Sequence, residues 1–526
     1  MPSRSQQLEE FELLNRETVE SDEDFDPYDA FEQRRGLGSV SFPNRRLSNP
    51  IKAFLWELNP FKSGLGRSPR TSRPHRKSGA TRGSSRRICR SSRRCCFVLN
   101  LIITILITLI FLSAVFAPSY TTPPAHYQTL RHQAESSRKG EYGRANPDNE
   151  KIFISASIYD EGGYLLAGAW GDAVLKLLDI LGNTNVFLSI YENESGEAAQ
   201  TAQIRFERKV QCPHEIVYDK EFSVDDVNAI TLPDGSERTK RVAYLAEVRN
   251  RALLPLVDGQ KEIVYDKLLF LNDVIFDPVE AAQLLLSTNT DAHGHASYRA
   301  ACAVDFINPF KFYDTYATRD AQGYSMGVPF FPWFTTAGEG LSRRDVLAGK
   351  DAVRVKSCWG GMVAFDAKPF QTTQPLRFRA TTDMYWDASE CCLIHADLMK
   401  SGVFFHDGSP VGVYMNPFVR VAYSTRTLNW LHFTRRFEHL FSIPHNIVNH
   451  IVGLPWFNPR RLEEPGAKVQ EKVWVSDNNT EMGGSFQMET RETTGDGFCG
   501  KRMLQLIKES PRNGEKNWEV VPVPPG

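Results

Sequence analysis

The stretch "EIVYDKLLFLNDVIFDPVE", residues Glu262–Glu280, places a polar pair inside an otherwise apolar run. The segment "KLLFL" has the composition of a buried strand, and Asn272 and Asp273 follow it directly. A carboxylate is costly inside such a run unless it is paired or holds a metal ion. Because ligands bind at the carboxyl ends of strands in open α/β sheets, both side chains are predicted to line a binding site.

Strands and helices alternate around this stretch. "KIFISASIY" (Lys151–Tyr159) and "NVFLSIYE" (Asn185–Glu192) read as strands, and apolar residues recur at helical spacing between them. A further helix, "TKRVAYLAEVRNRALLPLV", precedes the strand that ends before Asn272. Strand–helix–strand units with short connections predict a parallel sheet, so the fold class is α/β and Rossmann-like. No GxGxxG follows the first strand, which argues against a dinucleotide fingerprint.

The first 94 residues have too little apolar content for a core. Residues 1–32 are acidic and residues 33–94 are basic and rich in Ser, Pro and Gly, so residues 1–94 are predicted to be disordered. Residues 95–117, "CCFVLNLIITILITLIFLSAVFA", carry no charge and are long enough for a membrane-spanning helix, which takes about 20 residues. A basic tract could bind nucleic acid, but arginines beside an apolar segment favour a topology signal, with the N-terminus in the cytoplasm.

The remaining residues are then expected in a lumen. Residues 118–148 are predicted to form a polar stem, residues 149–465 a folded domain, and residues 466–526 a flexible tail. An even number of cysteines beyond the apolar segment allows up to three disulfides, whose pairing the spacing does not give. These are Cys212, Cys302, Cys358, Cys391, Cys392 and Cys499, and the sequons for glycosylation are at Asn193 and Asn478.

Asp273 is the first candidate for a metal ligand. Mg²⁺ and Mn²⁺ prefer oxygen ligands and keep open positions for a substrate. The alternative is that Asp273 caps the next helix, but Asp277 lies directly before Pro278 and fits that cap better. In "DAHGHAS", His293 and His295 have HxH spacing, and their small, polar neighbours favour a solvated loop.

Several segments together resemble one family. They are "EVRNRAL", "LLFLNDVIF", "ACAVDFINPFKFYDTYATRD", "SCWGGMVAFDAKPF", "SECCLIHADL" and "VYMNPFVRVAY", which span roughly residues 150–425. The set resembles the fungal α-1,3-mannosyltransferases named after the cryptococcal capsule enzymes, glycosyltransferase family 69. The resemblance implies a GT-A-like domain, with a Rossmann-like mixed sheet and flanking helices, behind a single-pass type II anchor in the Golgi membrane. It also implies a GDP-mannose donor, a divalent ion (Mn²⁺ or Mg²⁺), and retaining transfer to a mannan-type or capsule-type glycan.

The resemblance assigns metal and donor contacts. Asp273 is the expected metal ligand, although Ile275 stands where the usual Asp-x-Asp motif has its second acid, and His406 in "VFFHDG" is the expected late ligand. Arg249 and Asn250 are expected to face the donor together with Asn272, because a guanidinium suits a diphosphate. The alternatives are a loop hydrogen bond for His406 and a solvated helix face for Arg249.

Acceptor and catalytic contacts complete the expected site. Trp359, Gly360 and Gly361 are expected to contact the acceptor, since an indole packs on a sugar and glycines allow close backbone approach. The alternative is a buried Trp in a tight turn, with Cys358 in a disulfide. Glu390, with Asp387 second, is expected beside the reacting carbon, although a helix N-terminus also favours acids.

Two other functions stay open at this stage. One is a transferase for a different nucleotide sugar, because the sequence does not expose the contacts that select the donor. The other is a non-catalytic scaffold of a Golgi transferase complex, which the incomplete Asp-x-Asp motif favours. A glycosidase needs two carboxylates flanking a cleft, and no such pair stands out.

Overall fold

The structure is a computed structural model that describes most of the chain from residue 85 to residue 524. The ranges outside this description are 1–84, 137–142, 161, 194, 221, 260–262, 401–404, 407–408, 478–482, 509–516 and 525–526. The predicted disorder of residues 1–94 therefore falls almost wholly outside the described residues.

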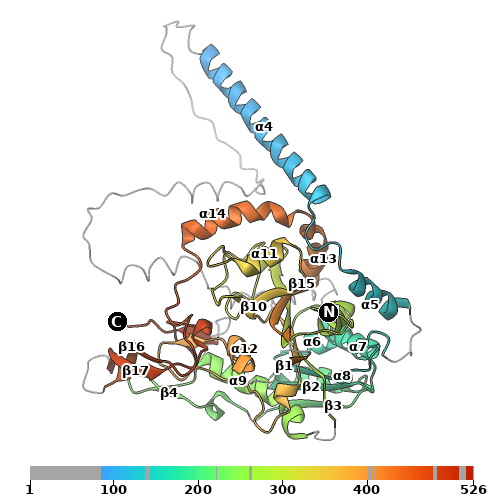
Figure 1. The fold of residues 1–526 in the computed structure, drawn as a ribbon, viewed down its shortest axis with the longest axis vertical. Coiled ribbons are helices and arrows are strands. Elements are labelled where there is room, and N and C mark those ends of the chain that lie inside the picture. The colour runs from blue at the N-terminus through green and yellow to red at the C-terminus, as the bar shows by residue number, and fades with distance from the viewer. Residues whose placement is uncertain are drawn as a thin grey trace, which may run out of the picture. The chain divides into compact units, whose positions relative to one another are not determined.

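A long N-terminal helix and a folded domain make up the described chain (Figure 1). The described residues fall into two compact units, one ending at Leu109 and the other beginning at Ile110. Helix α4 (Ser85–Phe116) contains the stretch Phe97–Phe116, whose 20 residues are apolar and long enough to cross a membrane. This agrees with the single anchor predicted at residues 95–117.

A mixed sheet forms the centre of the domain. Within the described residues it has ten strands, and β6 lies in the middle between a parallel and an antiparallel neighbour. Across the sheet the strands are β3 (His214–Asp219), β2 (Val186–Asn193), β1 (Ile152–Ile158), β6 (Lys267–Leu271), β11 (Met362–Asp366), β7 (Ala300–Asn308), β15 (Val413–Ala422), β10 (Val353–Ser357) and β9 (Arg319–Asp320), with β8 (Lys311–Phe312) against β7.

The predicted parallel sheet is confirmed for one half of this order. Strands β3, β2, β1 and β6 are parallel. On the other side, β11 runs antiparallel to both β6 and β7. The α/β class and the mixed sheet expected of a GT-A-like domain are therefore confirmed.

Helices cover both faces of the sheet, because its central strands are apolar on both sides. One core joins Ile154 of β1 and Leu269 of β6 to α7, α8 and α10. The other joins Phe153 and Phe270 to α9 and α12. The helices of the domain are α5 (Ala125–Ser136), α6 (Tyr164–Ala167), α7 (Ala169–Leu181), α8 (Gly196–Glu207), α9 (Arg241–Ala252), α10 (Pro278–Ser287), α11 (Leu341–Leu347), α12 (Glu390–Lys400), α13 (Thr425–Thr434) and α14 (Ser442–Val452).

Helix α10 begins where the sequence predicts. The Asp277 Oδ1 atom accepts from the backbone N–H groups of Val279 and Glu280 at 2.8 and 3.0 Å, and Pro278 occupies the first turn. His293 and His295 are exposed, as expected for a solvated loop.

The prediction of a polar stem is wrong for its first part. Ser119 and Tyr120 are buried, and the Ser119 backbone N–H donates to the Arg435 carbonyl at 2.9 Å. Tyr127 of α5 is fully buried, and its hydroxyl accepts from Asn416 Nδ2 at 2.6 Å. Composition suggested a tether, but a few aromatic side chains dock this segment on the domain.

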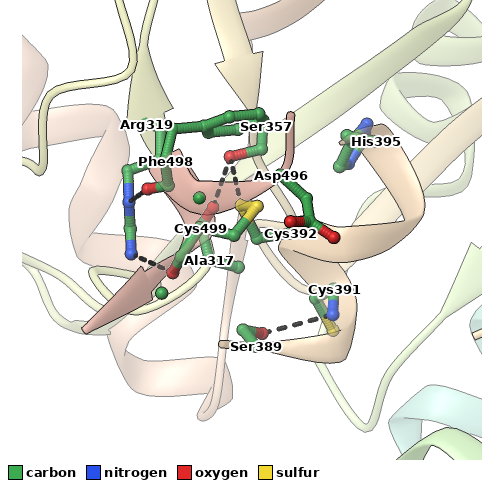
Figure 2. Close-up of a disulfide and its surroundings, with 12 residues drawn as sticks. Ala317, Arg319, Ser357, Ser389, Cys391, Cys392, His395, Asp496, Phe498 and Cys499 are labelled. Carbon is green, nitrogen blue, oxygen red and sulfur yellow. Dashed lines mark hydrogen bonds between the residues drawn. A yellow bond between two sulfur atoms is a disulfide. The ribbon is translucent and has the colours of Figure 1, made fainter. Parts of the chain in front are cut away.

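The prediction of a flexible tail after residue 465 is also wrong. Cys499 forms a disulfide with Cys392 of α12, and the Arg319 guanidinium donates to the carbonyls of Phe498 and Cys499 (Figure 2). Leu504 and Leu506 are fully buried. The tail elements are β16 (Lys468–Ser476), β17 (Gly484–Glu492), β18 (Gly500–Lys501), β19 (Gln505–Ile507) and β20 (Trp518–Val520).

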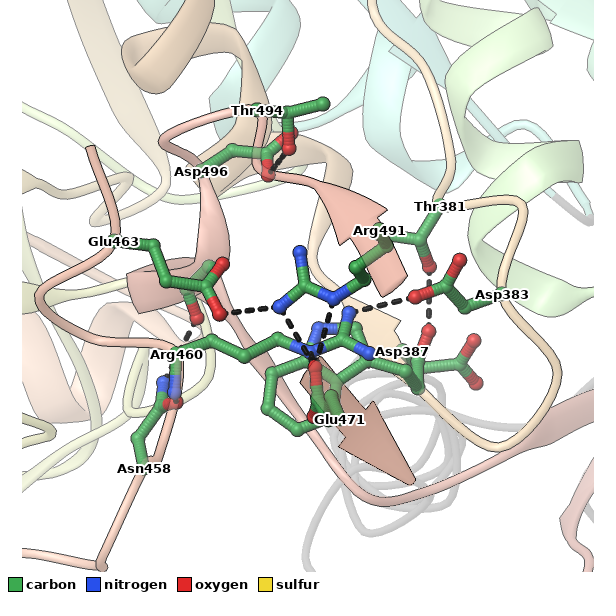
Figure 3. A network of polar contacts seen from close by, with 12 residues as sticks. Thr381, Asp383, Asp387, Asn458, Arg460, Glu463, Glu471, Arg491, Thr494 and Asp496 are labelled. Carbon is green, nitrogen blue, oxygen red and sulfur yellow. Dashed lines mark hydrogen bonds and ion pairs between the residues drawn. The ribbon is translucent and has the colours of Figure 1, made fainter. Parts of the chain in front are cut away.

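Ion pairs fasten the β16–β17 hairpin to the domain (Figure 3). The Arg460 guanidinium pairs with Glu471 of β16 at 2.9 Å and with Asp383 at 2.6 Å. Arg491 of β17 pairs with Glu471 at 2.7 Å and also with Glu463. The low apolar content of this region misled the prediction, because charged side chains, one disulfide and a small apolar cluster around Leu504 and Leu506 hold it on the domain. The remaining short strands are β4 (Ile230–Thr231), β5 (Glu237–Arg238), β12 (Asp387–Ala388), β13 (Phe405–His406) and β14 (Ser409–Pro410).

We expect Tyr127→Ala to lower the free energy of unfolding by about 3–5 kcal/mol, because it removes a buried aromatic ring and leaves a cavity. Chemical denaturation measures this change. The control is Thr129→Ala, an exposed position of the same helix. An unchanged stability of Tyr127→Ala would mean that this segment does not pack on the domain.

Candidate active site

A largely buried arginine, with 11% of its side chain exposed, lies at the centre of the predicted site. Arg249 is in the last turn of α9, and its Nε atom donates to Glu390 Oε1 at 3.1 Å. Its Nη1 atom donates to Asn272 Oδ1 at 3.2 Å, and its guanidinium lies 4.6 Å from the ring centre of Trp359. Four residues from separate stretches of sequence are thus in contact, and the alternative of a solvated helix face for Arg249 is wrong.

Asn272 is fixed through both its backbone and its side chain. Strand β6 ends at Leu271, so Asn272 is the first residue beyond the sheet. Its backbone N–H donates to the Gly361 carbonyl at 2.9 Å, and its carbonyl accepts from Trp170 Nε1 at 2.8 Å. The Trp359 indole N–H also donates to Asn272 Oδ1, at 3.2 Å. The polar pair in the apolar run therefore begins with a residue that joins α7, α9 and the turn before β11.

Asp273 projects beyond this cluster. Its side chain is exposed, and its negative charge acts on Arg249. An exposed carboxylate at the carboxyl end of a central strand fits Mg²⁺ or Mn²⁺, since these ions bind oxygen and keep several water ligands. The second predicted ligand, His406, lies in β13, and its side chain is outside the described part of the structure.

The Trp-Gly-Gly turn packs against the protein itself. Gly360 has φ +56°, and a Cβ atom there would lie 2.0 Å from the Ala303 carbonyl oxygen of β7. A Cβ atom on Gly361 would lie 2.6 Å from Val274 Cγ1. The close approach that requires glycine is therefore to the chain's own strand and not to an acceptor.

Trp359 is also a core residue in this structure. Its side chain is 4% exposed and packs against Phe270 and Phe378. The adjacent Cys358 forms a disulfide with Cys302. The predicted stacking of a sugar on this indole is therefore not supported, and the alternative of a buried Trp beside a disulfide matches the structure. Among the described residues Cys212 and Cys391 stay unpaired, so two disulfides form and not three.

Glu390 and Asp387 have different partners although they are close in sequence. Glu390 begins α12, and its Oε1 atom accepts from Arg249 and from the Cys391 thiol at 3.3 Å. Asp387 is fully buried, where it pairs with Lys240 Nζ at 2.9 Å and accepts from the Gln505 backbone N–H at 2.7 Å. Burial raises the pKa of Asp387, and the nearby Lys240 opposes this shift. Of the two predicted acids, Glu390 joins the cluster and Asp387 holds the C-terminal region in place.

Asn250 has a positioning contact in the structure. Its Nδ2 atom donates to the Phe378 carbonyl at 2.9 Å, and its Oδ1 atom accepts from the Phe378 N–H at 2.8 Å. Both the nitrogen and the oxygen of the Asn250 side chain are therefore hydrogen-bonded to the backbone of Phe378. This holds Phe378 against Arg249, whose guanidinium lies 5.9 Å from the phenyl ring, and does not support the predicted contact of Asn250 with a donor.

Sequence reasoning assigned no part to Asp314, which organises the Trp-Gly-Gly turn. Its Oδ2 atom accepts from the backbone N–H groups of Trp359 and Gly360 at 2.9 and 3.3 Å. Its own backbone N–H donates to the buried Asp305 at 3.1 Å. Burial raises the pKa of Asp305 to about 7. Asp314 lies in a quoted family segment, but nothing local in that segment indicates its distant partners.

Glu192 is a second candidate site residue to which the sequence analysis assigned no role. It lies at the carboxyl end of β2, is fully buried, and neither carboxyl oxygen has a hydrogen-bond partner among the described residues. Burial, together with the charge of Asp160, raises its pKa to about 7. A buried acid with a raised pKa at this edge of a sheet is a candidate ligand group. An acid ending an apolar strand is the same sequence signal that singled out Asp273.

The segment that carries this cluster matches a known protein family. Residues 151–397 match the family model described as cryptococcal mannosyltransferase 1. The resemblance to the cryptococcal-type mannosyltransferases is confirmed. The cluster of Arg249, Asn272, Trp359 and Glu390 lies inside the matched segment, as does Asp273. His406 and the C-terminal region lie outside it.

A comparison with solved structures finds distant matches. One is the mannosyltransferase PcManGT from Pyrobaculum calidifontis, in complex with GDP-Man and Mn²⁺. It has 11% identity and a TM-score of 0.30, covering 67% of this chain and 81% of that one. Another is mannosyl-3-phosphoglycerate synthase from Rubrobacter xylanophilus, with 11% identity and a TM-score of 0.28, covering 69% of this chain and 95% of that one. A comparison with curated proteins finds no match.

We expect Asp387→Asn to lower the free energy of unfolding by about 3–5 kcal/mol, because it leaves the buried Lys240 ammonium without a counter-charge. Thermal and chemical unfolding measure the effect, with the exposed Asp225→Asn as the matched control. If Asp387→Asn unfolds like the unmodified protein and only loses activity, Asp387 is a catalytic group and this assignment is wrong.

Glu192→Gln is expected to stabilise the protein at neutral and higher pH. The folded-state pKa is raised from an ordinary 4.5 to about 7. The stability contribution of Glu192 is therefore fully present below pH 4.5 and is lost as the pH rises through 7. Above that pH the variant should gain up to about 3 kcal/mol over the unmodified protein.

Unfolding curves from pH 4 to pH 8 test this difference, and Glu197→Gln makes the same chemical change at an exposed position. A constant difference between Glu192→Gln and the unmodified protein across this range would show that Glu192 is ionised in the folded state.

Proposed function

We propose that this protein is a membrane-anchored glycosyltransferase that moves mannose from GDP-mannose to a mannose-containing glycan, with an α-1,3 linkage and retention at the anomeric carbon. One observation carries the proposal. Arg249, Asn272 and Glu390 are in contact at the carboxyl end of β6, beside the exposed Asp273. All four lie within the segment that matches the mannosyltransferase family.

Each residue of this group has a distinct part in the proposed reaction. Asp273 would hold a divalent ion, Mn²⁺ or Mg²⁺, which when bound stabilises negative charge on a departing diphosphate. Arg249 fixes the Glu390 carboxylate in position through the contact at 3.1 Å. Glu390 is 3% exposed and paired with Arg249, so its part in this group is to supply the counter-charge that holds the guanidinium at the edge of the site. Asn272 keeps Arg249 and the Trp359 indole in place, because its Oδ1 atom accepts a hydrogen bond from each.

The proposed location is the Golgi membrane, with the domain in the lumen. The arginines Arg86, Arg87, Arg90, Arg93 and Arg94, which precede the apolar stretch of α4, favour a cytoplasmic N-terminus. The disulfides Cys302–Cys358 and Cys392–Cys499 support an oxidising compartment on the other side. The proposed partners are a mannan-type or capsule-type acceptor glycan and other transferases of the same membrane.

We expect Asp273→Ala to lower transfer at least about 100-fold while the free energy of unfolding changes by less than about 0.5 kcal/mol, since the residue is exposed. The full chain in detergent is incubated with GDP-mannose, Mn²⁺ and a small α-mannoside, and GDP release and product mass are followed. Asp225→Ala, at another exposed acid, is the control.

Other outcomes of this experiment separate the alternatives. Metal-dependent binding of a different nucleotide sugar, without turnover of GDP-mannose, would indicate a transferase for that sugar. Binding of no nucleotide sugar would indicate a non-catalytic scaffold. Transfer that survives Asp273→Ala would show that this carboxylate is not the metal ligand.

A further inference from the structure

Helix α14 buries two polar side chains against the protein and leaves three isoleucines exposed, beside the exposed Asn446 and His450. Ile443, Ile447 and Ile451 recur every four residues and are 72%, 56% and 74% exposed. His445 and Asn449, on the opposite side, are 0% and 3% exposed. This is the reverse of the pattern that a surface helix of a water-soluble domain has.

The buried polar side chains of α14 have hydrogen-bond partners in the protein. Asn449 Oδ1 accepts from the Val328 backbone N–H at 2.7 Å, and its Nδ2 atom lies 2.9 Å from His445 Nδ1. Arg343 contacts the same His445 nitrogen at 2.9 Å and donates to the Ser442 carbonyl at 2.8 Å. These contacts fix the rotation of α14, so the isoleucines are held outward and cannot turn into the core.

Helix α13 continues the exposed apolar surface. Trp430 and Phe433 are half exposed or more, and Phe437 follows in the short 3₁₀ helix η5 (Arg435–Phe441) that leads into α14. We call this surface, made by α13, η5 and α14, the outer helical face. Exposed apolar patches of this kind mark sites that bind a membrane or another protein.

The exposed charged side chains of the outer helical face are basic. The only acidic residue in the range 425–452 is Glu438, which is buried and pairs with Arg420 at 2.6 Å. Arg426 and Arg436 are exposed. Aromatic and aliphatic side chains flanked by arginines, without an acid, suit the boundary between lipid headgroups and acyl chains.

The chain places this face next to the end of the anchor. Helix α4 ends at Phe116, and the Ser119 N–H donates to the carbonyl of Arg435, where η5 begins. Three residues of extended chain span at most about 11 Å. Arg435 Nη1 also donates to the Tyr120 carbonyl at 3.4 Å. The outer helical face therefore lies within a short tether of the point where the anchor leaves the bilayer.

We propose that the outer helical face lies on the membrane surface, with Trp430 and the α14 isoleucines in the headgroup–acyl boundary of the lipid. The proposal rests on the anchoring by α4 in the proposed function. Lipid is the occupant because the tether is short, the exposed side chains are apolar and basic, and the polar side of α14 is already satisfied by the protein.

The test uses the full chain in nanodiscs of equal parts phosphatidylcholine and phosphatidylserine. Their acyl chains carry bromine, which quenches tryptophan fluorescence, either near the headgroup or near the chain end. The protein has 9 tryptophans, so the emission of Trp430 is obtained by subtracting the spectrum of Trp430→Phe. Ile447→Trp adds a second probe on α14, and Ile204→Trp is the matched control on α8, where Ile204 is 45% exposed.

We expect bromine near the headgroup to remove most of the emission of Trp430 and of the tryptophan introduced by Ile447→Trp. The tryptophan introduced by Ile204→Trp should keep its emission. Equal emission of all three probes with and without bromine, in protein that still elutes with the nanodiscs, would overturn the proposal and indicate that a protein covers this face. Protein that does not elute with the nanodiscs would overturn the anchoring as well.

Discussion

The buried guanidinium of Arg249 is the constraint on which the candidate site depends. A charge removed from water is stabilised only if its hydrogen bonds and counter-charge are supplied by the protein. Glu390 supplies the counter-charge, Asn272 accepts a second hydrogen bond, and Trp359 lies against the cation. Because these partners come from α12, the end of β6 and the turn before β11, one buried charge fixes the relative positions of three segments. Asp273 is then held at the surface beside them.

A second set of contacts supports the start of α12. The disulfide Cys392–Cys499 joins this helix to the C-terminal region, and Asp387 in β12 pairs with β18 and with Lys240. Both contacts lie within three residues of Glu390. The C-terminal region, which lies beyond the matched family segment, is therefore needed to position a residue within that segment. A chain truncated after the matched residues would lose these supports.

The membrane-proximal residues affect how the site is presented. A long flexible stem would allow the domain to sample many orientations above the bilayer. Instead, Ser119, Tyr120 and Tyr127 dock on the same unit that carries the site. The domain is therefore tethered by only a few residues beyond Phe116, and the outer helical face can fix its orientation. The proposed docking of this face on the membrane would give the carboxyl edge of the sheet a defined direction.

The sequence by itself determined the α/β alternation, the single apolar helix, the cap at Asp277 and the polar end of β6. These features arise from neighbours in the chain, through periodicity and local hydrogen bonds. Only the tertiary structure decided which of Asp387 and Glu390 joins the cluster, since their partners Lys240 and Arg249 lie 147 and 141 residues away in the chain. It also showed that position 360 must be glycine because a Cβ atom there would collide with the Ala303 carbonyl oxygen. The C-terminal region is joined to the domain by the disulfide of Cys499. Pairing between distant residues depends on which strands become neighbours, and no local pattern contains that information.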